Sequence, residues 1–489
     1  MPKRKTSKNR KFRPQECTNQ MNFQECELAI LRHVVDENEK IAGEKLASGE
    51  EIKKMIQIVE DFLVKKKLIC YGGTAINNIL PKHAQFYDKN YQIPDYDFFS
   101  HNAMDDAKEL ADIFFKEGYL DVEAKSGVHA GTYKVFVNFI PMADITHIHK
   151  DLFKTLQKDA VKVAGIYYAP PNFLRMGMYL ELSRPAGDTS RWEKVLKRLN
   201  LLNTYHPLKV KYDCQSVDFQ RKMDGNEGQS EQIYTIVRDT FIDLGLVFFG
   251  GYASSLYSRY MPKHAKRFIQ KIPDFDVLSE DYERSAKIAK ERLETEGFKK
   301  IKIVHHDAFG EIIPAHYELK YGEDILAFIY KPIACHNYNT ITIDKKEINV
   351  ATIDTIMSFY LAFLYSEAIY YYKDRILCMA QYLFEVERKT RLAQRGLLKR
   401  YVPKCIGVQE TMESIRAKKA AKFAELRKKR NSRAFEEAFL KYTPGLRAEK
   451  REEEKEEEKE EEEKEEKKSN KTRKQRKSNS LLKNMLFPL

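Results

Sequence analysis

Alternating apolar and polar positions predict an α+β fold that opens with helices. Apolar residues recur at helical spacing over residues 25–47 and again over 49–67. A short apolar run over 68–71 follows and ends in the pair Gly72-Gly73, which is typical of a strand that leads through a tight turn into a helix. Further on, residues 93–99 alternate apolar and acidic positions at the period of a strand.

The pattern continues with mixed helices and strands. A helix over 103–117 is closed by Gly118, and strands follow over 119–148, joined by a glycine-containing loop at 126–132 that suits either a substrate contact or a plain hairpin. Ser190 with Glu193 predicts a capping box that opens another helix. One long helical pattern, rich in aromatic residues, runs from 351 to about 398, and we expect these rings to pack in a core rather than stack on bases.

The chain contains an internal repeat. Residues 246–279 (LVFFGGYASSLYSRYMPKHAKRFIQKIPDFDVLS) share with residues 68–100 the apolar run, the glycine pair, a Pro-Lys-His-Ala tetrapeptide and Ile-Pro-Asp-aromatic-Asp. An amphipathic helix follows the match in each copy, and the second one ends at Gly297. Two related domains are therefore expected.

The glycine pair and three acids carry the candidate chemistry. Glycines at a strand-to-helix turn let backbone N–H groups approach a phosphate, and the helix start adds partial positive charge. Asp95 and Asp97, two positions apart in a strand, point to one face, where carboxylates can share divalent cations. Asp144 lies inside an apolar run, where an acid is costly to bury unless paired or metal-bound. Each motif alone also fits a plain turn or an acidic loop, but together they predict a nucleotidyltransferase with two metal ions, Mg²⁺ or Mn²⁺.

Basic residues downstream are candidates for binding the triphosphate. Arg191 and Lys194 lie at the predicted helix start, and Arg175 and Arg184 precede it. The sequence leaves open whether these side chains bind the nucleotide or primer, or are solvated surface. We interpret Trp192 as a packing anchor. The expected nucleotide-binding residues are Gly72, Gly73, Thr74, Arg191 and Lys194.

The second copy lacks a clear third acid. Pairing Tyr133 with Tyr317 places Phe328 opposite Asp144, whereas counting from the aspartate pair places Asp324 there. The sequence Tyr-Gly-Glu-Asp around Asp324 predicts a turn, whereas Asp144 lies inside an apolar run. We therefore favour an active first copy and a degenerate second copy.

Composition narrows the class of partner. The net charge of +13 favours a polyanion such as nucleic acid, and an acidic run at 449–468, with 13 Glu against 7 Lys or Arg, hides part of the basic excess. The 7 cysteines are odd in number and form no C-x-x-C pair, so we expect reduced thiols and neither a disulfide framework nor a zinc site. No apolar stretch is long enough to predict a membrane span.

These observations divide the chain into five predicted parts. They are a disordered basic arm at 1–20, a catalytic domain at 21–205, a degenerate copy at 206–350, a helical segment at 351–445 and a disordered, charged low-complexity tail at 446–489.

At YGGTAIN, LPKHA, IPDYDFFS, MADIT and ELSRPAGDTSRWEKV, the sequence resembles the poly(A) polymerase catalytic subunits of large cytoplasmic DNA viruses, over about residues 50–398. The resemblance implies two tandem nucleotidyltransferase-like domains, each a mixed sheet flanked by helices, the second one degenerate. It implies that Asp95, Asp97 and Asp144 bind metal and that Gly72 and Gly73 contact phosphate. The spacing from Gly73 to Asp95 is longer than in most of the wider superfamily, and the Glu-Lys tail has no counterpart.

The resemblance also implies an activity and partners. ATP would be the substrate and an RNA 3′ end the acceptor, in a homodimer or with a processivity subunit, without a membrane, in the viral factory of the host cytoplasm or in the virion. Two alternatives stay open. One is another template-independent nucleotidyltransferase acting on tRNA ends or a small-molecule hydroxyl, and the other is an inactive RNA-binding scaffold.

Overall fold

The structure is a computed structural model that describes residues 15–18, 20–47, 49–87, 93–210, 214, 227–261, 275–368, 370–390 and 393–444. The predicted tail at 446–489 and most of the predicted basic arm lie outside these residues. None of the described helices combines the length and the apolar character needed to cross a membrane. Contacts divide the chain into two compact units, Met1–His101 with Thr146–Lys422 and Asn102–Ile145 with Phe423–Leu489. The five domain boundaries stay predictions.

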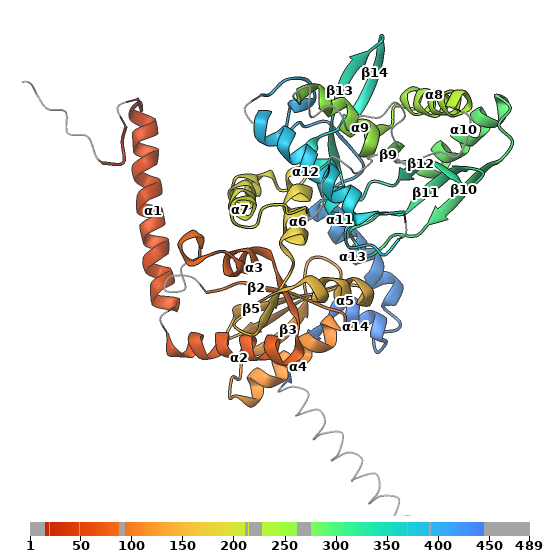
Figure 1. The fold of residues 1–489 in the computed structure, drawn as a ribbon. Coiled ribbons are helices and arrows are strands. Elements are labelled where there is room, and N and C mark those ends of the chain that lie inside the picture. Colours follow the sequence, from red (N-terminus) through yellow and green to blue (C-terminus); the bar gives the residue numbers. More distant parts are fainter. Residues whose placement is uncertain are drawn as a thin grey trace, which may run out of the picture. The chain divides into compact units, whose positions relative to one another are not determined.

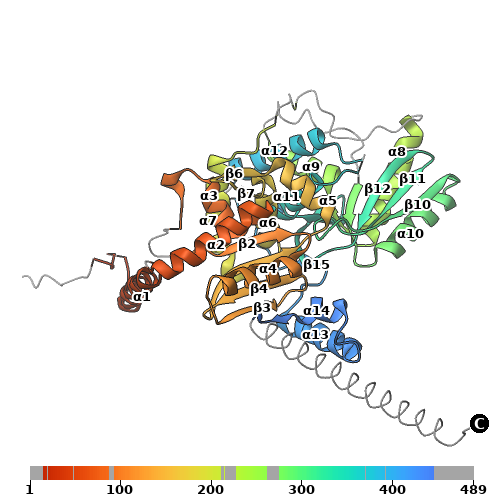
Figure 2. The ribbon, with the colours of Figure 1, turned by 90° about the horizontal axis from the view of Figure 1, so that it is seen from below.

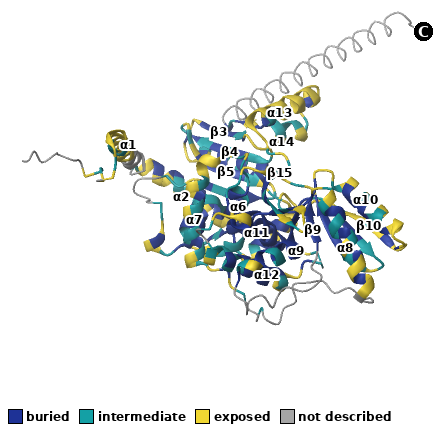
Figure 3. Ribbon diagram, turned by 90° about the horizontal axis from the view of Figure 1, so that it is seen from above, coloured by how far each residue is buried: buried dark blue, intermediate teal, exposed yellow. Residues whose placement is uncertain are grey.

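The first unit opens with two helices and a strand-turn-helix (Figure 1). Helix α2 buries the apolar stripe that the sequence predicted, whereas α1 is largely exposed, as the burial colours of Figure 3 show. Before the chain leaves this unit at His101, its elements are α1 (Phe23–Ala47), α2 (Glu50–Lys66), β1 (Ile69–Tyr71), α3 (Gly72–Ile79), η1 (Lys82–Ala84) and β2 (Tyr96–Ser100). After the chain returns to this unit it forms α5 (Lys150–Asp159), β6 (Val161–Val163), β7 (Ile166–Tyr168), α6 (Pro171–Leu182), η2 (Thr189–Arg191) and α7 (Trp192–Tyr205).

Strand pairing places the glycine turn beside the paired aspartates. Strand β1 lies between β2 and β7, antiparallel to β2 and parallel to β7, and β6 completes the order β2-β1-β7-β6. In this register Tyr71 is opposite Asp97. The residue before the glycines and the second aspartate are therefore neighbours, as the predicted strand-turn-helix requires.

The second copy of the motif, at 246–279, has the same strand pairing as the first copy, and it also lies in the first unit. Strand β8 is antiparallel to β9, with Phe249 opposite Asp276, and parallel to β14. The full strand order of this second sheet is β10-β11-β12-β9-β8-β14-β13-β15, and α8 and α10 pack together beside it (Figure 2). Its elements are α8 (Glu227–Asp243), β8 (Val247–Phe249), α9 (Gly250–Tyr257), η3 (Ser258–Tyr260), β9 (Phe275–Leu278), α10 (Tyr282–Thr295), β10 (Ile301–His306), β11 (His316–Tyr321), β12 (Asp324–Tyr330), β13 (His336–Ile343) and β14 (Lys346–Ala351). The α+β fold of mixed sheets flanked by helices is confirmed, and the equivalent pairings of β1 and β8 confirm the repeat.

The single long helix predicted from residue 351 is wrong. The chain forms α11 (Ile353–Phe363) and α12 (Lys373–Thr390), then η5 (Gly396–Leu398), β15 (Cys405–Ile406) and α13 (Met412–Leu426). Between α11 and α12, the Ser366 side chain accepts a hydrogen bond from the Ala368 backbone N–H at 3.1 Å, a local bond that competes with helix continuation. The aromatic residues of this region are mostly buried, as expected; Tyr360, Phe363, Tyr365, Tyr371 and Tyr382 are among the core side chains.

Helices α6 and α11 form the densest helix contact of the first unit, and every residue of α11 is buried. A buried ionic network supports this contact. Arg400 donates to Asp354 at 2.9 and 2.5 Å and to Glu387 at 2.6 Å, and Tyr179 of α6 donates to Glu387 at 3.0 Å. Because each buried charge has partners, the desolvation cost of the group is offset. The network ties the end of the first copy to the helices that follow the second.

The second unit is a small sheet with two helices. Strand order is β16-β3-β4-β5, β3 and β4 are an antiparallel hairpin, and α4 packs against both. The loop at 126–132 is therefore a plain hairpin connection, in which the Gly127 N–H donates to the Thr132 carbonyl at 2.6 Å. The elements are α4 (Ala103–Lys116), β3 (Val122–Ser126), β4 (Thr132–Val137), β5 (Ile140–His147), whose last two residues belong to the first unit, α14 (Arg433–Phe439) and β16 (Lys441–Tyr442).

The expectation of reduced thiols is wrong for six cysteines. The disulfides join Cys17 to Cys26, Cys214 to Cys378 and Cys335 to Cys405. The last two pairs are 164 and 70 residues apart in sequence, so only the fold brings them together. Cys70 in β1 is free and buried, and its burial raises the pKa of the thiol well above its usual value.

Candidate nucleotide-binding and catalytic site

The glycine pair forms the predicted turn from β1 into α3. Tyr71 is extended, Gly72 has φ +72°, and α3 begins at Gly72 itself. A Cβ added to Gly72 would lie 2.4 Å from Oδ2 of Asp97. Both the left-handed backbone and the close carboxylate therefore require glycine at this position. The first glycine and the second aspartate of the motif are in direct proximity.

Asp95 and Asp97 lie at the start of β2 rather than both inside it. Strand β2 begins at Tyr96, and the Asp97 N–H donates to the Asp95 carbonyl at 3.2 Å, so the backbone turns between the two acids. Thr74 Oγ1 donates to the same carbonyl at 2.7 Å and ties the first turn of α3 to this segment. Asp95 is exposed and Asp97 is half-buried. The prediction that both aspartates lie inside one straight strand and point to one face is therefore wrong for Asp95, which precedes the strand.

Aromatic packing fixes β1 against β2. The rings of Tyr71 and Phe99 stack with centroids 3.9 Å apart, and the Tyr71 hydroxyl and Thr146 Oγ1 lie 2.8 Å apart in a hydrogen bond. Both contacts involve Tyr71, the residue that directly precedes Gly72. The glycine turn is therefore held by packing as well as by the ladder.

Arg198 is a site residue that the sequence reasoning missed. A Cβ on Gly73 would lie 2.5 Å from the Tyr87 hydroxyl and 2.9 Å from an Arg198 guanidinium nitrogen. Arg198 donates to the Tyr87 hydroxyl at 2.6 Å. The signal was present, because Arg191, Lys194 and Arg198 follow one another at i, i+3 and i+7, which places three cations on one helix face.

Lys194 and Arg191 lie in the same charged neighbourhood. Burial lowers the pKa of Lys194, the cations Arg198 and Arg191 lower it further, and the carboxylate of Asp95 opposes them. Arg191 itself pairs with Glu181 at 3.1 Å. The basic face of α7 thus lies beside the aspartate segment of the first unit. The predicted capping box is wrong, because Asp188, not Ser190, accepts the capping hydrogen bond and α7 starts at Trp192.

Arg175 is buried and supports the structure. It is 1% exposed and donates to Asn203 at 2.7 Å, to Asn172 and to the His206 carbonyl. Burial lowers the pKa of Arg175 and also that of Arg184. Trp192 is a packing anchor, as expected, since its Nε1 donates to the Glu181 carbonyl at 3.0 Å and its ring lies against Tyr401.

Asp144 belongs to the second unit. It lies in β5, is half-buried and pairs there with Lys134. An acid inside this apolar strand therefore has an ionic partner, which is the condition on which its burial depends. Its convergence with Asp95 and Asp97 stays a prediction.

The second sheet shows which residue replaces the third acid. After a hairpin turn, β12 begins at Asp324, and its fifth residue, Phe328, is the register partner of Asp276. Strand β5 likewise begins after a hairpin turn, and its fifth residue is Asp144. Phe328 packs against His316, Tyr330 and Tyr370 with ring centroids 5.5, 6.1 and 4.8 Å away. Counting from the hairpin therefore favours Phe328, not Asp324, as the counterpart of Asp144.

The glycine turn of the second copy keeps its geometry. Gly250 has φ +77°, and a Cβ there would lie 2.1 Å from Oδ2 of Asp276. Asp276 is 8% exposed, and Asp274 lies outside the described residues. Within the described residues the second copy preserves the turn and Asp276, and Phe328 stands where counting from the hairpin places the third acid.

The residues present in the first unit fit a hard divalent cation. Mg²⁺ takes oxygen ligands and is held by one or two carboxylates together with substrate phosphates, and Asp95 and Asp97 supply such carboxylates next to the glycine turn. Within the described part of the chain, no three His, Cys, Asp or Glu side chains form a group that could hold a metal ion without further ligands.

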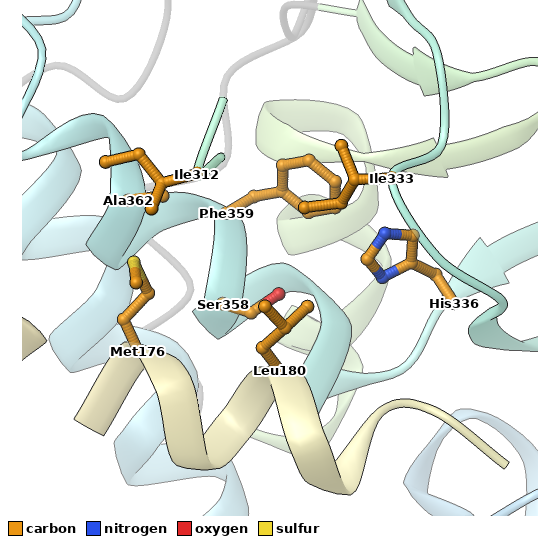
Figure 4. Close-up of a pocket in the computed structure, with 8 residues that line it drawn as sticks. All are labelled: Met176, Leu180, Ile312, Ile333, His336, Ser358, Phe359 and Ala362. Atoms are coloured by element: carbon orange, nitrogen blue, oxygen red, sulfur yellow. The ribbon is translucent and has the colours of Figure 1, made fainter. Parts of the chain in front are cut away.

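A separate cavity lies between α6 and α11 (Figure 4). Met176 and Leu180 line it from α6, and Ser358, Phe359 and Ala362 from α11. The fully buried His336 faces it, and burial lowers the pKa of this imidazole to about 3. With about 220 Å³, open mouth included, the cavity is smaller than most ligand pockets, and it contains none of the predicted site residues.

Residues 57–188 match the protein-family model described as poly(A) polymerase catalytic subunit. A protein of African swine fever virus (isolate Tick/Malawi/Lil 20-1/1983), named as a candidate poly(A) polymerase catalytic subunit, is 33% identical over 183 residues, which are 36% of this chain and 38% of that protein. The protein of Acanthamoeba polyphaga mimivirus with the same name is 30% identical over 186 residues, 37% of this chain and 30% of that protein. The matched segments thus span less than half the length of these relatives.

The crystal structure of the Megavirus polyadenylate synthase is similar in fold, with a TM-score of 0.72, 19% sequence identity and 89% of each chain covered. At this identity the likeness concerns the fold, and it extends far beyond the segment that matches in sequence. The predicted resemblance is therefore confirmed, and residues 57–188 carry the sequence signature of the viral poly(A) polymerase catalytic subunits on a fold that this chain shares with a viral polyadenylate synthase.

Proposed function

We propose that this chain is a template-independent polynucleotide adenylyltransferase that adds AMP from ATP to RNA 3′ ends. The observation that carries the proposal is the apposition of Gly72 and the carboxylate of Asp97, with Asp95 in the adjacent turn and the cations of α7 beside it. This combination supplies backbone N–H groups at a helix start, acidic metal ligands and positive charge for a triphosphate.

Each group of the candidate site has a role in that reaction. The N–H groups at the start of α3 point toward the glycine turn, where they can donate to phosphate oxygens. Lys194 and Arg191 neutralise the charge of the triphosphate and hold it in place. Asp95, Asp97 and Asp144 would hold two divalent cations, which activate the attacking oxygen and neutralise the leaving phosphates.

The chemistry is a single displacement at phosphorus. The oxygen of the RNA 3′-hydroxyl forms a bond to the α-phosphorus of ATP, and the bond from that phosphorus to the bridging oxygen of the β-phosphate breaks. The hydroxyl proton passes to solvent and pyrophosphate leaves. The chain contributes orientation and charge compensation, which are the main terms in phosphoryl transfer.

The strand register favours the first copy as the active one. Phe328 lies opposite Asp276 and is the fifth residue of β12, as Asp144 is the fifth residue of β5, so counting along the two strands favours Phe328 as the counterpart of Asp144. An aromatic residue provides no metal ligand. We propose that the second copy supports the first and leaves catalysis to it.

A primer-extension assay tests the proposal. Purified full-length chain is incubated with oligo(A) primer and each of the four NTPs, with Mg²⁺ or Mn²⁺. Selective incorporation from ATP that Asp144→Asn abolishes, while the variant keeps the wild-type melting temperature, is expected. Asp144→Asn with undiminished extension would reject the three-acid site.

The same assay separates the alternatives. Incorporation of other nucleotides, or onto tRNA ends or small hydroxyl compounds in place of oligo(A), would identify a different nucleotidyltransferase. RNA binding without any incorporation would identify an inactive scaffold. The family resemblance supports a homodimer or a processivity subunit as partner and the viral factory or virion as location, which light scattering and imaging of infected cells would test.

A further inference from the structure

The described residues that follow α3 have no role in the proposed reaction. This segment runs from Leu80 through η1 toward β2, and its described part ends at Tyr87. The side chain of Asn77 in α3 anchors it, because Asn77 Oδ1 accepts from the backbone N–H groups of Phe86 and Tyr87 at 2.8 and 2.9 Å. Asn77 is 3% exposed, so this anchor is protected from water.

The anchored segment holds Arg198 of α7. The guanidinium carbon lies 4.9 Å from the ring centroid of Phe86 and 5.4 Å from that of Tyr87. Such contacts between a guanidinium and aromatic rings are favourable. Together with the hydrogen bond to the Tyr87 hydroxyl at 2.6 Å, they fix the guanidinium from two sides.

The held guanidinium lies at the second glycine. Nη1 and Nη2 of Arg198 would be 2.9 and 3.1 Å from a Cβ on Gly73, so the cation borders the N-terminus of α3. In the described part of the chain no ion pair joins Arg198 to a carboxylate. A guanidinium has five N–H donors, and the Tyr87 hydroxyl accepts only one of its bonds.

We propose that Arg198 binds the terminal phosphates of the incoming nucleoside triphosphate and that Tyr87 and Phe86 are positioning residues for it. This inference rests on the proposed function, because it places a nucleotide at the glycine turn. The Arg fork suits phosphate oxygens, and a guanidinium already held in place loses little freedom on binding. The segment that follows α3 is thereby explained as the arm that carries the two aromatic rings.

Equilibrium binding of a phosphate series is the test. Full-length protein is titrated with AMP, ADP, ATP and inorganic tripolyphosphate in the presence of Mg²⁺, for wild type, Arg198→Met and Tyr87→Phe. Arg198→Met is expected to weaken ATP and tripolyphosphate binding by about tenfold or more, since hydrogen bonds to charged groups contribute roughly that much. Its affinity for AMP is expected to stay within about twofold of wild type, which lies inside the usual scatter for a lost neutral contact.

Tyr87→Phe keeps the ring and removes the hydroxyl, so it tests positioning. A smaller loss in the same ATP-to-AMP ratio is expected, and the double variant with Arg198→Met should bind ATP no more weakly than Arg198→Met alone. Lys197→Met is the matched control, because Lys197 is an exposed cation of the same helix that pairs with Glu193. It should leave all four affinities unchanged.

The outcomes distinguish this inference from the proposed function. Equal loss of AMP and ATP affinity in Arg198→Met, no loss of either, or the same loss in Lys197→Met would overturn the role of Arg198. Additive effects of Tyr87→Phe and Arg198→Met would overturn the positioning role. A chain that binds ATP through Arg198 yet incorporates no nucleotide would keep the inference and reject the proposed polymerase activity, whereas in an active chain Arg198→Met should raise KM for ATP more than it lowers kcat.

Discussion

The two copies of the strand-turn-helix differ less in backbone than in what surrounds it. Both have a left-handed first glycine against an aspartate, and both pair the strand before the glycines with the strand that bears this aspartate. In the first copy the cations Lys194 and Arg198 lie beside the turn. In the second, aromatic residues fill the sheet around Asp276, Phe328 among them. The same turn thus stands in two different chemical surroundings, so the turn alone does not identify an active copy.

The largest expected difference is in catalysis. Asp97→Asn should lower primer extension by more than the roughly 10–100-fold that loss of an outer-shell metal partner costs, because a carboxylate oxygen that would bind metal is replaced by an amide. The counterpart Asp276→Asn should leave the rate near wild type. Rates are measured with both variants at saturating ATP. A rate that falls only in Asp276→Asn would show that the second copy is the active one.

The next effect concerns the aromatic residue at the third-acid position. Phe328→Asp should destabilise the protein by about 3–5 kcal/mol, because it leaves an unpaired charge in a buried aromatic cluster. Denaturant unfolding at neutral pH measures the free energy. Phe328→Leu separates cavity formation from charge and should cost less. A Phe328→Asp protein as stable as wild type would mean that this position tolerates an acid. Packing would then not explain why an aromatic residue stands there.

Alanine at the first glycine should separate stability from activity. Gly72→Ala and Gly250→Ala should each cost roughly 1–2 kcal/mol of folding free energy, because an L-residue is strained in the left-handed region. Only Gly72→Ala should also reduce primer extension, since its Cβ displaces the Asp97 carboxylate. Equal activity losses in the two variants would remove the functional distinction between the turns.

The smallest expected effect is at the residue before the glycines, which is Tyr71 in the first copy and Phe249 in the second. Tyr71→Phe removes the hydrogen bond to Thr146 and keeps the ring stack on Phe99, so a loss of about 0.5–1.5 kcal/mol is expected. Thermal unfolding provides the measurement, with Thr146→Val and the double variant completing the cycle. If the effects of the two single changes simply add, the two hydroxyls do not interact.

Local patterns predicted the elements that depend on local sequence. The glycine turn, the amphipathic α2, the helices closed at Gly118 and Gly297 and the internal repeat all rest on periodicity or backbone freedom that neighbouring residues decide. The break between α11 and α12 was missed because a hydroxyl-to-backbone bond at Ser366 stops a pattern that is otherwise helical. The cap before α7 was assigned to Ser190 because capping-box spacing also fits a residue inside a 3-10 turn.

Long-range features were harder to predict. The disulfides and the burial of Arg175 depend on segments far apart in sequence, and no spacing rule indicates them. For Arg198, the sequence shows its helical spacing from Lys194. It does not predict the hydrogen bond between Arg198 and Tyr87, which lie 111 positions apart. The glycine turn and Asp97 meet as the motifs predicted, and their role as a catalytic site stays a prediction, whereas the contact of Arg198 with this turn came only from the tertiary structure.

The ionic network around Arg400 has a consequence for how this duplicated chain can fold. Asp354, Glu387 and Arg400 follow the second copy in sequence, yet through Tyr179 they reach α6 of the first. Deleting the helices that follow the second copy would remove α11 from α6 and leave the Tyr179 hydroxyl without its acceptor Glu387. We therefore expect the first copy not to fold alone, because the charged side chains that hydrogen-bond around α6 come from the far end of the chain.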